Sequence, residues 1–595
     1  MRFLCRTKAF YRWMLCLFLI MGCGVAGAAD LDLNQAYGKL REKLLGRYQP
    51  TIEKLAQSEK AYEDRMDQAF TADTEFGRDA LPDHYAPWWT PKVEDPVTQS
   101  SDVAREDVET LFVRALKHSS QIKVFSDLPL IRETTIQEAE GPYDFRVFAE
   151  GKYGDISEPV GDDLRTGGPP RFEQDSRSIA AGLKKRFLPG TEVELSQELE
   201  GIDNNSIFFN PHDQALATTR LIVKQPLLRG GGITYNRSVI DLAKMDHSIS
   251  EDELRRQVES HLLEIARAYW GLYLERAVLV QKKKLAQETH KLYRKMKQRV
   301  GVDVPASLLA RAKSQVVARQ LDAVEAEFAM KNASDRIRAL VNDPGLIASG
   351  GLEIITRQVP QHRLESLDLG AALHTALENR PEVEQALKQI KSAAIRLQRS
   401  KNELWPDLNL FFETYVMGLE GDFQYDRSYH RQFDEGRPSY NVGLRFEYPL
   451  GNNAAEARER RKRIEVRQLL NQLDTTVQNV FLEVQVSFRE VIKNYKEMVR
   501  RYQVMDSNQE EIKALLARVD YLLSENEAYG DVLYRLMDAL DRLNDAEAKF
   551  AQSELTYNLS LYNINRSMGT LIAVNDIRIT RTEQKHLPLI VLEKK

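Results

Sequence analysis

The chain has 595 residues, of which 29% are charged and 43% are hydrophobic, and its formal net charge is −5. This balance offers no basic surface of the kind that binds nucleic acid, so we expect no nucleic acid partner. Beyond the first 30 residues no run of about 20 apolar residues occurs, which excludes a transmembrane helix; entry into a bilayer would require strands in a closed barrel.

Residues 1–29 have the layout of a secretory signal peptide, with basic residues, then an apolar core, then small residues. Two processing outcomes remain open: cleavage after Ala28 or Ala29, or lipidation of Cys23 within the sequence IMGC. All three cysteines lie in this segment. The mature chain therefore has no disulfide and no cysteine nucleophile.

Residues 30–101 form an N-terminal extension. A charged helical stretch over 40–70 is followed by a linker that contains several prolines and the pair Trp88 and Trp89. Two positions remain open for this extension. It wraps the outside of the other helices, or its tryptophans lie at a protein or membrane interface.

Residues 102–342 read as a first structural repeat. Helical spacing predicts a helix over 106–136, and alternation predicts strands near 143–153 and 219–225, followed by long helices over 230–342. An extra alternating pair near 177–200 predicts a hairpin that either joins the strands or extends outside the membrane. Two polar stretches between these strands, together with residues 418–438 of the second repeat, are expected to be loops that face the cell exterior.

Residues 366–572 repeat this order after a connector over 343–365, and residues 573–595 form a C-terminal tail. A helix precedes strands over 407–417 and 439–448, and long helices follow over 452–572. The descending helices also have similar sequences, AVEAEFA at 323–329 and DAEAKFA at 545–551, which indicates an internal duplication. Helices of roughly 70 residues are on the order of 100 Å long, a length typical of coiled coils and helical barrels.

Three motifs carry a resemblance to a known family: QPLLRG at 225–230, AYWGLY at 268–273 and YNLSLYNINRSMGTL at 557–571. Together with the duplication they resemble the TolC-type outer-membrane efflux channels over about residues 102–574. The resemblance implies an α+β membrane protein that forms a homotrimer. Each protomer would give four strands to one 12-stranded β-barrel, continuous with a long periplasmic α-helical barrel. The expected location is the outer membrane of a Gram-negative-type cell.

The resemblance also implies a function. The trimer would be the exit channel of a tripartite efflux or secretion system, with a periplasmic adaptor (membrane fusion protein), an inner-membrane transporter and outer-membrane lipid as its partners. Conduction requires no catalytic residue, cofactor or metal. The histidines are scattered and have no partners at metal spacing. No nucleophile, base and acid lie close together along the chain, so we expect no enzyme activity.

Within the family, an acidic ring narrows the periplasmic end of the tunnel. Asp538 matches one acidic position, Arg535 occupies the companion position one turn earlier, and Asp541 one turn later could restore the second charge. Alternatively, these are ordinary solvated helix charges.

The tips of the two long hairpins are the expected docking surface for the adaptor, because they carry apolar residues where polar ones are usual. The residues concerned are Val300, Gly301, Val302, Asp303, Tyr521, Leu522 and Leu523. The alternative is that they only pack one hairpin against its neighbour.

A second function class remains, a non-conducting periplasmic coiled-coil scaffold or adaptor protein. It would share the long helices, but it has no need for apolar-faced strands at matching places in two repeats. The sequence leaves the substrate open among drugs, proteins, metal ions and polysaccharides.

Overall fold

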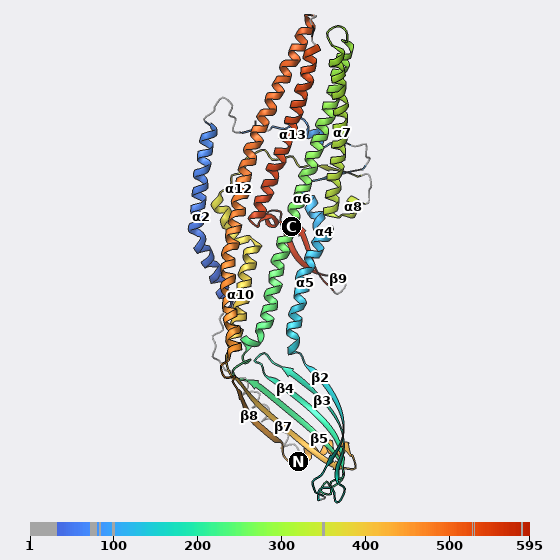
Figure 1. The fold of residues 1–595 in the computed structure, drawn as a ribbon, viewed down its shortest axis with the longest axis vertical. Coiled ribbons are helices and arrows are strands. Elements are labelled where there is room, and N and C mark those ends of the chain that lie inside the picture. The colour runs from blue at the N-terminus through green and yellow to red at the C-terminus, as the bar shows by residue number, and fades with distance from the viewer. Residues whose placement is uncertain are drawn as a thin grey trace, which may run out of the picture. The chain divides into compact units, whose positions relative to one another are not determined.

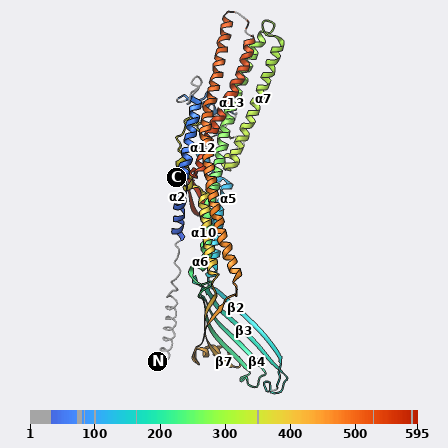
Figure 2. The ribbon, with the colours of Figure 1, turned by 60° about the vertical axis from the view of Figure 1, so that its left-hand side comes forward.

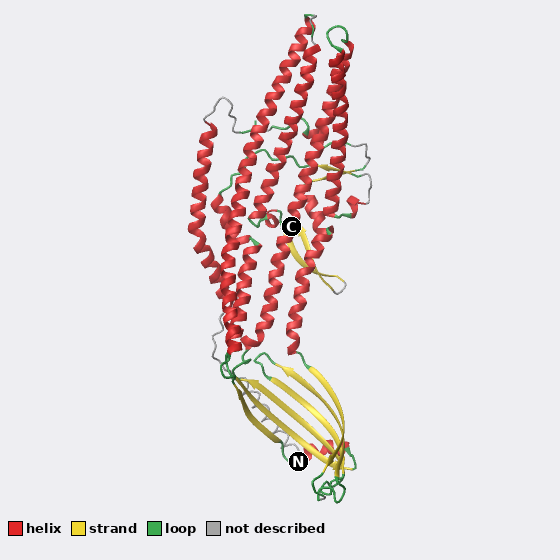
Figure 3. Ribbon diagram, in the orientation of Figure 1, coloured by secondary structure: helices red, strands yellow, loops and turns green. Residues whose placement is uncertain are grey.

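The computed structural model describes residues 33–71, 80–82, 85–97, 102–162, 164–347, 352–525, 528, 530–584 and 587–594. The predicted signal peptide, including Cys23, lies outside them. Within these ranges, no helix combines the length and the apolar character that crossing a bilayer requires. Contacts divide the chain into a unit that contains the large sheet and a unit that contains most of the helices. Figures 1 and 3 show the helices and strands of both.

Six antiparallel strands form the large sheet, in the order β2-β3-β4-β5-β7-β8. Figure 2 shows the sheet from a second direction. The strands are β2 (Arg146–Pro159), β3 (Arg171–Arg186), β4 (Glu192–Asn204), β5 (Asp213–Pro226), β7 (Asp407–Gly421) and β8 (Ser439–Glu447).

The two faces of this sheet differ sharply in polarity, because residues paired in the register share a face and alternate along each strand. The apolar face carries, among others, Val147, Ile179, Leu183, Leu195, Leu221, Phe412, Val442, Leu444 and Phe446. Several of its side chains are more than 60% exposed in the single chain, including those of Val147, Ile179 and Leu444. The polar face carries ion pairs between Lys184 and Glu194 (3.2 Å) and between Arg220 and Glu413 (3.3 Å).

The expectation of four strands per protomer is wrong, because the sheet has six. The hairpin predicted near 177–200 is β3 and β4, and it lies between β2 and β5 in the same sheet. Its alternation continues that of its neighbours: Leu183 pairs with Val147 on one side and Leu195 on the other. The segment over 418–438 also departs from the predicted loop, because it contains the helix α11 (Tyr425–Asp434).

The QPLLRG motif forms the junction between β5 and α6 (Ile233–Gln298). Gly230 has a φ of +78°, a conformation that favours glycine, and its amide donates to Asn402 Oδ1 over 2.8 Å. The side chain of Asn236 donates to the carbonyls of Gly230 and Gly232 over 2.9 and 3.0 Å. The motif therefore satisfies the polar backbone where a strand gives way to a long helix.

The helical unit is dominated by four long helices: α6, α7 (Ala306–Val341), α12 (Asn453–Ser524) and α13 (Gly530–Ser567). With 66 and 72 residues, α6 and α12 are each on the order of 100 Å long. Parts of both helices, and of α5 (Ser120–Glu140) and α10 (Pro381–Asn402), belong to the sheet unit. The shorter elements are α2 (Leu33–Thr71), α3 (Thr90–Val93), α4 (Val108–His118), α8 (Pro344–Ile347), α9 (Leu369–Asn379), α14 (Leu571–Val574), the parallel pair β1 (Val103–Glu106) and β6 (Glu353–Thr356), and the hairpin β9 (Ile577–Gln584) and β10 (Leu587–Lys594).

The other two motifs hold the connector between the repeats against the helices. From AYWGLY, the Tyr269 hydroxyl accepts from the Gln358 amide over 2.9 Å. From the C-terminal motif, Asn558 Oδ1 accepts from the Gln361 amide (2.9 Å), and the Tyr557 hydroxyl donates to the Arg363 carbonyl (2.5 Å). These buried polar side chains give an extended segment the hydrogen bonds that it cannot make with itself.

The N-terminal extension packs on the helices of its own chain. Glu59 of α2 accepts two hydrogen bonds from the Arg489 guanidinium, at 2.7 and 2.6 Å. Trp88 donates from Nε1 to Glu547 Oε1 over 2.7 Å, and the Trp89 side chain is fully buried. Both tryptophans thus contact the helical unit, as the wrapping arrangement requires.

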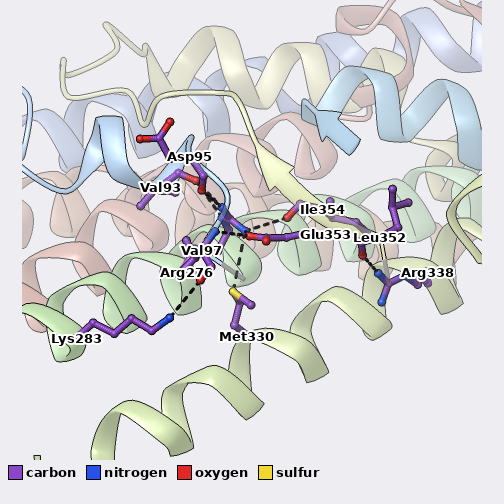
Figure 4. A network of polar contacts seen from close by, with 10 residues as sticks. All are labelled: Val93, Asp95, Val97, Arg276, Lys283, Met330, Arg338, Leu352, Glu353 and Ile354. Carbon is purple, nitrogen blue, oxygen red and sulfur yellow. Dashed lines mark hydrogen bonds and ion pairs between the residues drawn. The ribbon is translucent and has the colours of Figure 1, made fainter. Parts of the chain in front are cut away.

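A buried arginine joins this extension to the connector (Figure 4). The Arg276 guanidinium lies 2.5 Å from Glu353 Oε1 and donates to the carbonyls of Val93 (3.0 and 2.8 Å) and Asp95 (2.7 Å). Both charged side chains are nearly inaccessible to solvent. Beside them, Lys283 donates to the Val97 carbonyl over 3.2 Å. One side chain of α6 therefore binds two segments that are distant in sequence.

We predict that Arg276→Met destabilises the helical unit by about 3–5 kcal/mol, because it removes the buried cation that faces Glu353. Thermal unfolding should show a lower midpoint, and limited proteolysis should cut residues 80–101 faster. Lys283→Met removes a single donor that is more exposed than Arg276, and it should change the free energy of unfolding by less than about 1 kcal/mol. Equal unfolding midpoints for the two variants would contradict the role given to Arg276.

Candidate functional site

The tip between α6 and α7 is a compact turn over residues 299–305. Val300 and Val304 form an isolated β-bridge, and Gly301 between them has a φ of +85°. The Arg299 guanidinium donates to both carboxylate oxygens of Asp303, at 2.6 and 2.8 Å. This tip is therefore fixed by its own contacts.

The tip contacts the second hairpin at the first residue of α13. Asp303 Oδ2 accepts from the Gly530 amide over 2.9 Å. A Cβ atom at Gly530 would lie 2.7 Å from Val304 Cγ2 and 2.9 Å from the Asp303 carbonyl oxygen, so only glycine fits without a shift. The ends of the two hairpins are thus joined by a charged hydrogen bond and by close packing.

The predicted docking residues separate into exposed and internal groups. Val302 is 78% exposed, Tyr521 62% and Val300 43%, so these three present apolar surface at the tips. Leu522 is buried and Asp303 is held between the hairpins. Gly301 makes the turn. Leu523 lies in α12, and its side chain is outside the described set.

The two predicted aperture acids face α7 of the same chain. Asp538 Oδ1 accepts from Gln315 Nε2 over 3.0 Å. Asp541 forms a two-bond ion pair with Arg319, with 2.5 Å between Nε and Oδ1. Burial lowers the pKa of Arg319, but its hydrogen bond and attraction to Asp541 outweigh this effect, so the pKa lies above its usual value.

Arg535 behaves differently from the two acids. Its side chain is 70% exposed, and it pairs with Asp531 of the same helix over 2.9 Å. The sequence analysis predicted Asp538 and Asp541 to lie at a narrow point, and it did not predict that Gln315 and Arg319 would face them. The one available signal was weak: a spacing of four residues on α7 and of three on α13, each of which puts two side chains on one helix face.

These contacts make a clamp, which we define as Gln315, Arg319, Asp538 and Asp541. Its one ion pair, between Arg319 and Asp541, is about a quarter exposed. A partly exposed pair contributes about 0.2–1 kcal/mol, so the clamp fixes a geometry without making it irreversible. Among the described residues, no group of three or more His, Cys, Asp or Glu side chains is placed to hold a metal ion.

We predict that Asp541→Asn loosens the start of α13 from α7, because it removes the charge that pairs with Arg319. Amide hydrogen exchange over residues 530–545 should become faster by about 2- to 5-fold, the equivalent of a weak ion pair. Asp531→Asn removes an acid of the same helix whose partner Arg535 is exposed, and it should leave exchange over residues 536–545 at the wild-type rate. Identical exchange in both variants would show that the clamp does not hold α13.

A scan of protein-family models gives no match to this chain, and curated proteins likewise give none. Solved structures do match. The outer-membrane channel OprN aligns with 83% of this chain and 94% of its own length, at 14% identity and a TM-score of 0.56. A membrane protein from Pseudomonas aeruginosa aligns with 83% of this chain and 96% of its own, at 14% identity and a TM-score of 0.58.

The open state of the MtrE outer-membrane channel from Neisseria gonorrhoeae gives a similar result. It aligns with 83% of this chain and 97% of its own, at 14% identity and a TM-score of 0.54. At such identities the similarity concerns the fold. The chain has the fold of the TolC-type outer-membrane efflux channels, as the resemblance in its sequence predicts.

Proposed function

We propose that this protein is an outer-membrane exit channel of an efflux or secretion system. The observation that carries the proposal is the six-stranded sheet, which has one apolar and one polar face. Among the described residues, its outer strands β2 and β8 each pair on one side only. A sheet of this kind is suited to line a pore through a bilayer, with the polar face toward water and the apolar face toward lipid.

The edges of the sheet support assembly of several copies. In hydrocarbon, unpaired backbone groups cost several kcal/mol each, so β2 of one copy must pair with β8 of the next. Closure by rotational symmetry removes every edge. Three copies of a six-stranded sheet supply eighteen strands, in place of the twelve that the resemblance implied. Barrels of 16–18 strands enclose an aqueous channel.

An exposed apolar stripe on α7 supports the same assembly. Val317, Leu321, Val324 and Phe328 follow a spacing of four, three and four residues, and each is more than half exposed. This spacing is that of a coiled-coil seam. The stripe is therefore expected to pack against a helix of the neighbouring copy in a homotrimer, with the helical units around a periplasmic tunnel.

The hairpin tips support a docking role. Val300, Val302 and Tyr521 are exposed apolar residues on turns that are otherwise fixed by charged contacts. We infer that a periplasmic adaptor and its inner-membrane transporter engage this end, and that the clamp holds the tunnel narrow until they do.

The alternative function, a non-conducting periplasmic scaffold or adaptor, accounts for the helices alone. It leaves the exposed Val147, Ile179, Val442, Leu444 and Phe446 on one face of the sheet without a purpose. Such a patch in a water-soluble protein would promote aggregation.

We predict that the detergent-purified protein conducts ions in a planar bilayer, with rare openings in the wild type. Asp541→Asn should open more often, because it weakens the clamp at the narrow end. Asp531→Asn, the matched control, should behave as the wild type. Absence of conductance from both the wild type and the clamp variant, in well-folded trimers, would contradict a channel function.

We also predict that Val324→Asp with Phe328→Asp prevents trimer formation, because it places charges in the apolar stripe. Light scattering in detergent should show the mass of one copy in place of three. Val324→Ile with Phe328→Leu keeps the stripe apolar and should remain trimeric. A trimeric Asp variant would exclude α7 from the subunit interface.

A further inference from the structure

The short helix α11 packs on the apolar face of the sheet, not on its polar face. It connects β7 to β8 at the strand ends opposite those that lead into the long helices. Its contacts are with β7 and β5 and then with β4, strands inside the sheet order. Gly418, Ala217 and Leu199 lie beneath it, and the register places all three on the face that carries Leu195 and Phe412.

The sheet is built to receive this helix. Gly418 allows close approach, because a Cβ atom there would collide with the Ser428 carbonyl and lie 2.5 Å from the Gln432 amide nitrogen. The Ser428 hydroxyl in turn donates to the Gly418 carbonyl over 2.8 Å. A Cβ atom at Gly201 would likewise collide with the Tyr425 hydroxyl. Ala215 and Ala217 between them are fully buried.

Two polar side chains of this face find their partner in α11. Gln197 and Thr219 are opposite one another in the register and hydrogen-bond to each other. The Gln432 amide is 98% buried over them, with 3.1 Å between its Oε1 atom and the Thr219 hydroxyl. In lipid these groups would be costly without a polar cover. The helix is therefore a fixed part of this face.

The exposed side of α11 carries two aromatic residues among charged ones. Tyr429 and Phe433 are one turn apart, their rings meet edge to face at 5.7 Å between centroids, and they are 41% and 60% exposed. Asp426, Arg427 and Asp434 are exposed as well. Exposed aromatic rings beside charged side chains are what the boundary between lipid headgroups and hydrocarbon accommodates.

We propose that α11 lies on the outer surface of the membrane sheet and contacts outer-leaflet lipid, at the level of the headgroup boundary, through Tyr429 and Phe433. The occupant of this surface is lipid and not a second copy, because α11 covers the apolar face of β7, β5 and β4, whereas copies would pair in the plane of the sheet through its edge strands β2 and β8. The inference rests on the proposed function, since it requires the apolar face to be in a membrane.

Site-directed spin labelling tests the inference. The sequence has no cysteine after Cys23, so Phe433→Cys, Leu444→Cys and Asn441→Cys each give a single label in the full-length trimer. Leu444 lies on the apolar face of β8 and Asn441 on the polar face. The trimers are reconstituted into phosphatidylcholine vesicles, and the label's collisions are measured with oxygen, which concentrates in lipid, and with a water-soluble nickel chelate.

We expect the oxygen-to-nickel ratio to be several-fold higher at Phe433 and at Leu444 than at Asn441. A high ratio at Leu444 with a low ratio at Phe433 overturns the lipid contact of α11 and leaves the channel intact. A low ratio at Leu444 contradicts membrane insertion of the sheet and the proposed function with it. Tyr429→Cys should repeat the result for Phe433, which protects the test against a local effect of one substitution.

Discussion

Backbone hydrogen bonding at the edges of the sheet is the constraint on which the rest of this molecule depends. The six strands satisfy one another internally, but β2 and β8 each leave one side without a partner strand in a single chain. In a bilayer, a single copy of the chain would leave the backbone groups of these edges without hydrogen bonds, at a cost in free energy. In the function that we propose, assembly around a symmetry axis would complete the hydrogen bonding and leave the polar face around water.

The contacts of the helical unit fix the positions of the long helices, the extension and the connector. Its strongest contacts are buried and charged, as at Arg276 and Glu353, and they hold the extension and the connector to the long helices. Its contacts near the hairpin tips are more exposed, as at Arg319 and Asp541. A rigid middle and a weakly tied end are what a tunnel needs if only its end has to open.

Much of this fold can be predicted from the sequence, because the two-residue alternation of the strands and the helical spacing of apolar residues are both clear. Alternation over 439–448 and helical spacing after Pro449 identify β8 and α12 without further information. The hairpin β3–β4 was also visible, but its place in the sheet is set by pairing with β2 and β5, which a single strand's pattern does not specify. The four-strand expectation came from the resemblance and failed at that point.

The helix α11 and the clamp show where sequence reasoning fails for physical reasons. The polar residues of α11 suggested a loop, although Tyr425, Tyr429 and Phe433 have helical spacing. Two of its polar residues, Ser428 and Gln432, are buried against the sheet, which local pattern does not predict. Asp538 and Asp541 were identified, but their partners Gln315 and Arg319 are more than 200 positions away in the chain. Contacts of that kind follow from packing and not from local pattern.

The most direct test of the central claim is a three-dimensional reconstruction of the detergent-extracted protein by electron microscopy. We expect a threefold assembly in which β2 of each copy pairs with β8 of the next and eighteen strands close around a pore. A monomeric particle with free sheet edges, or a closed barrel of twelve strands with β3 and β4 outside it, would contradict it.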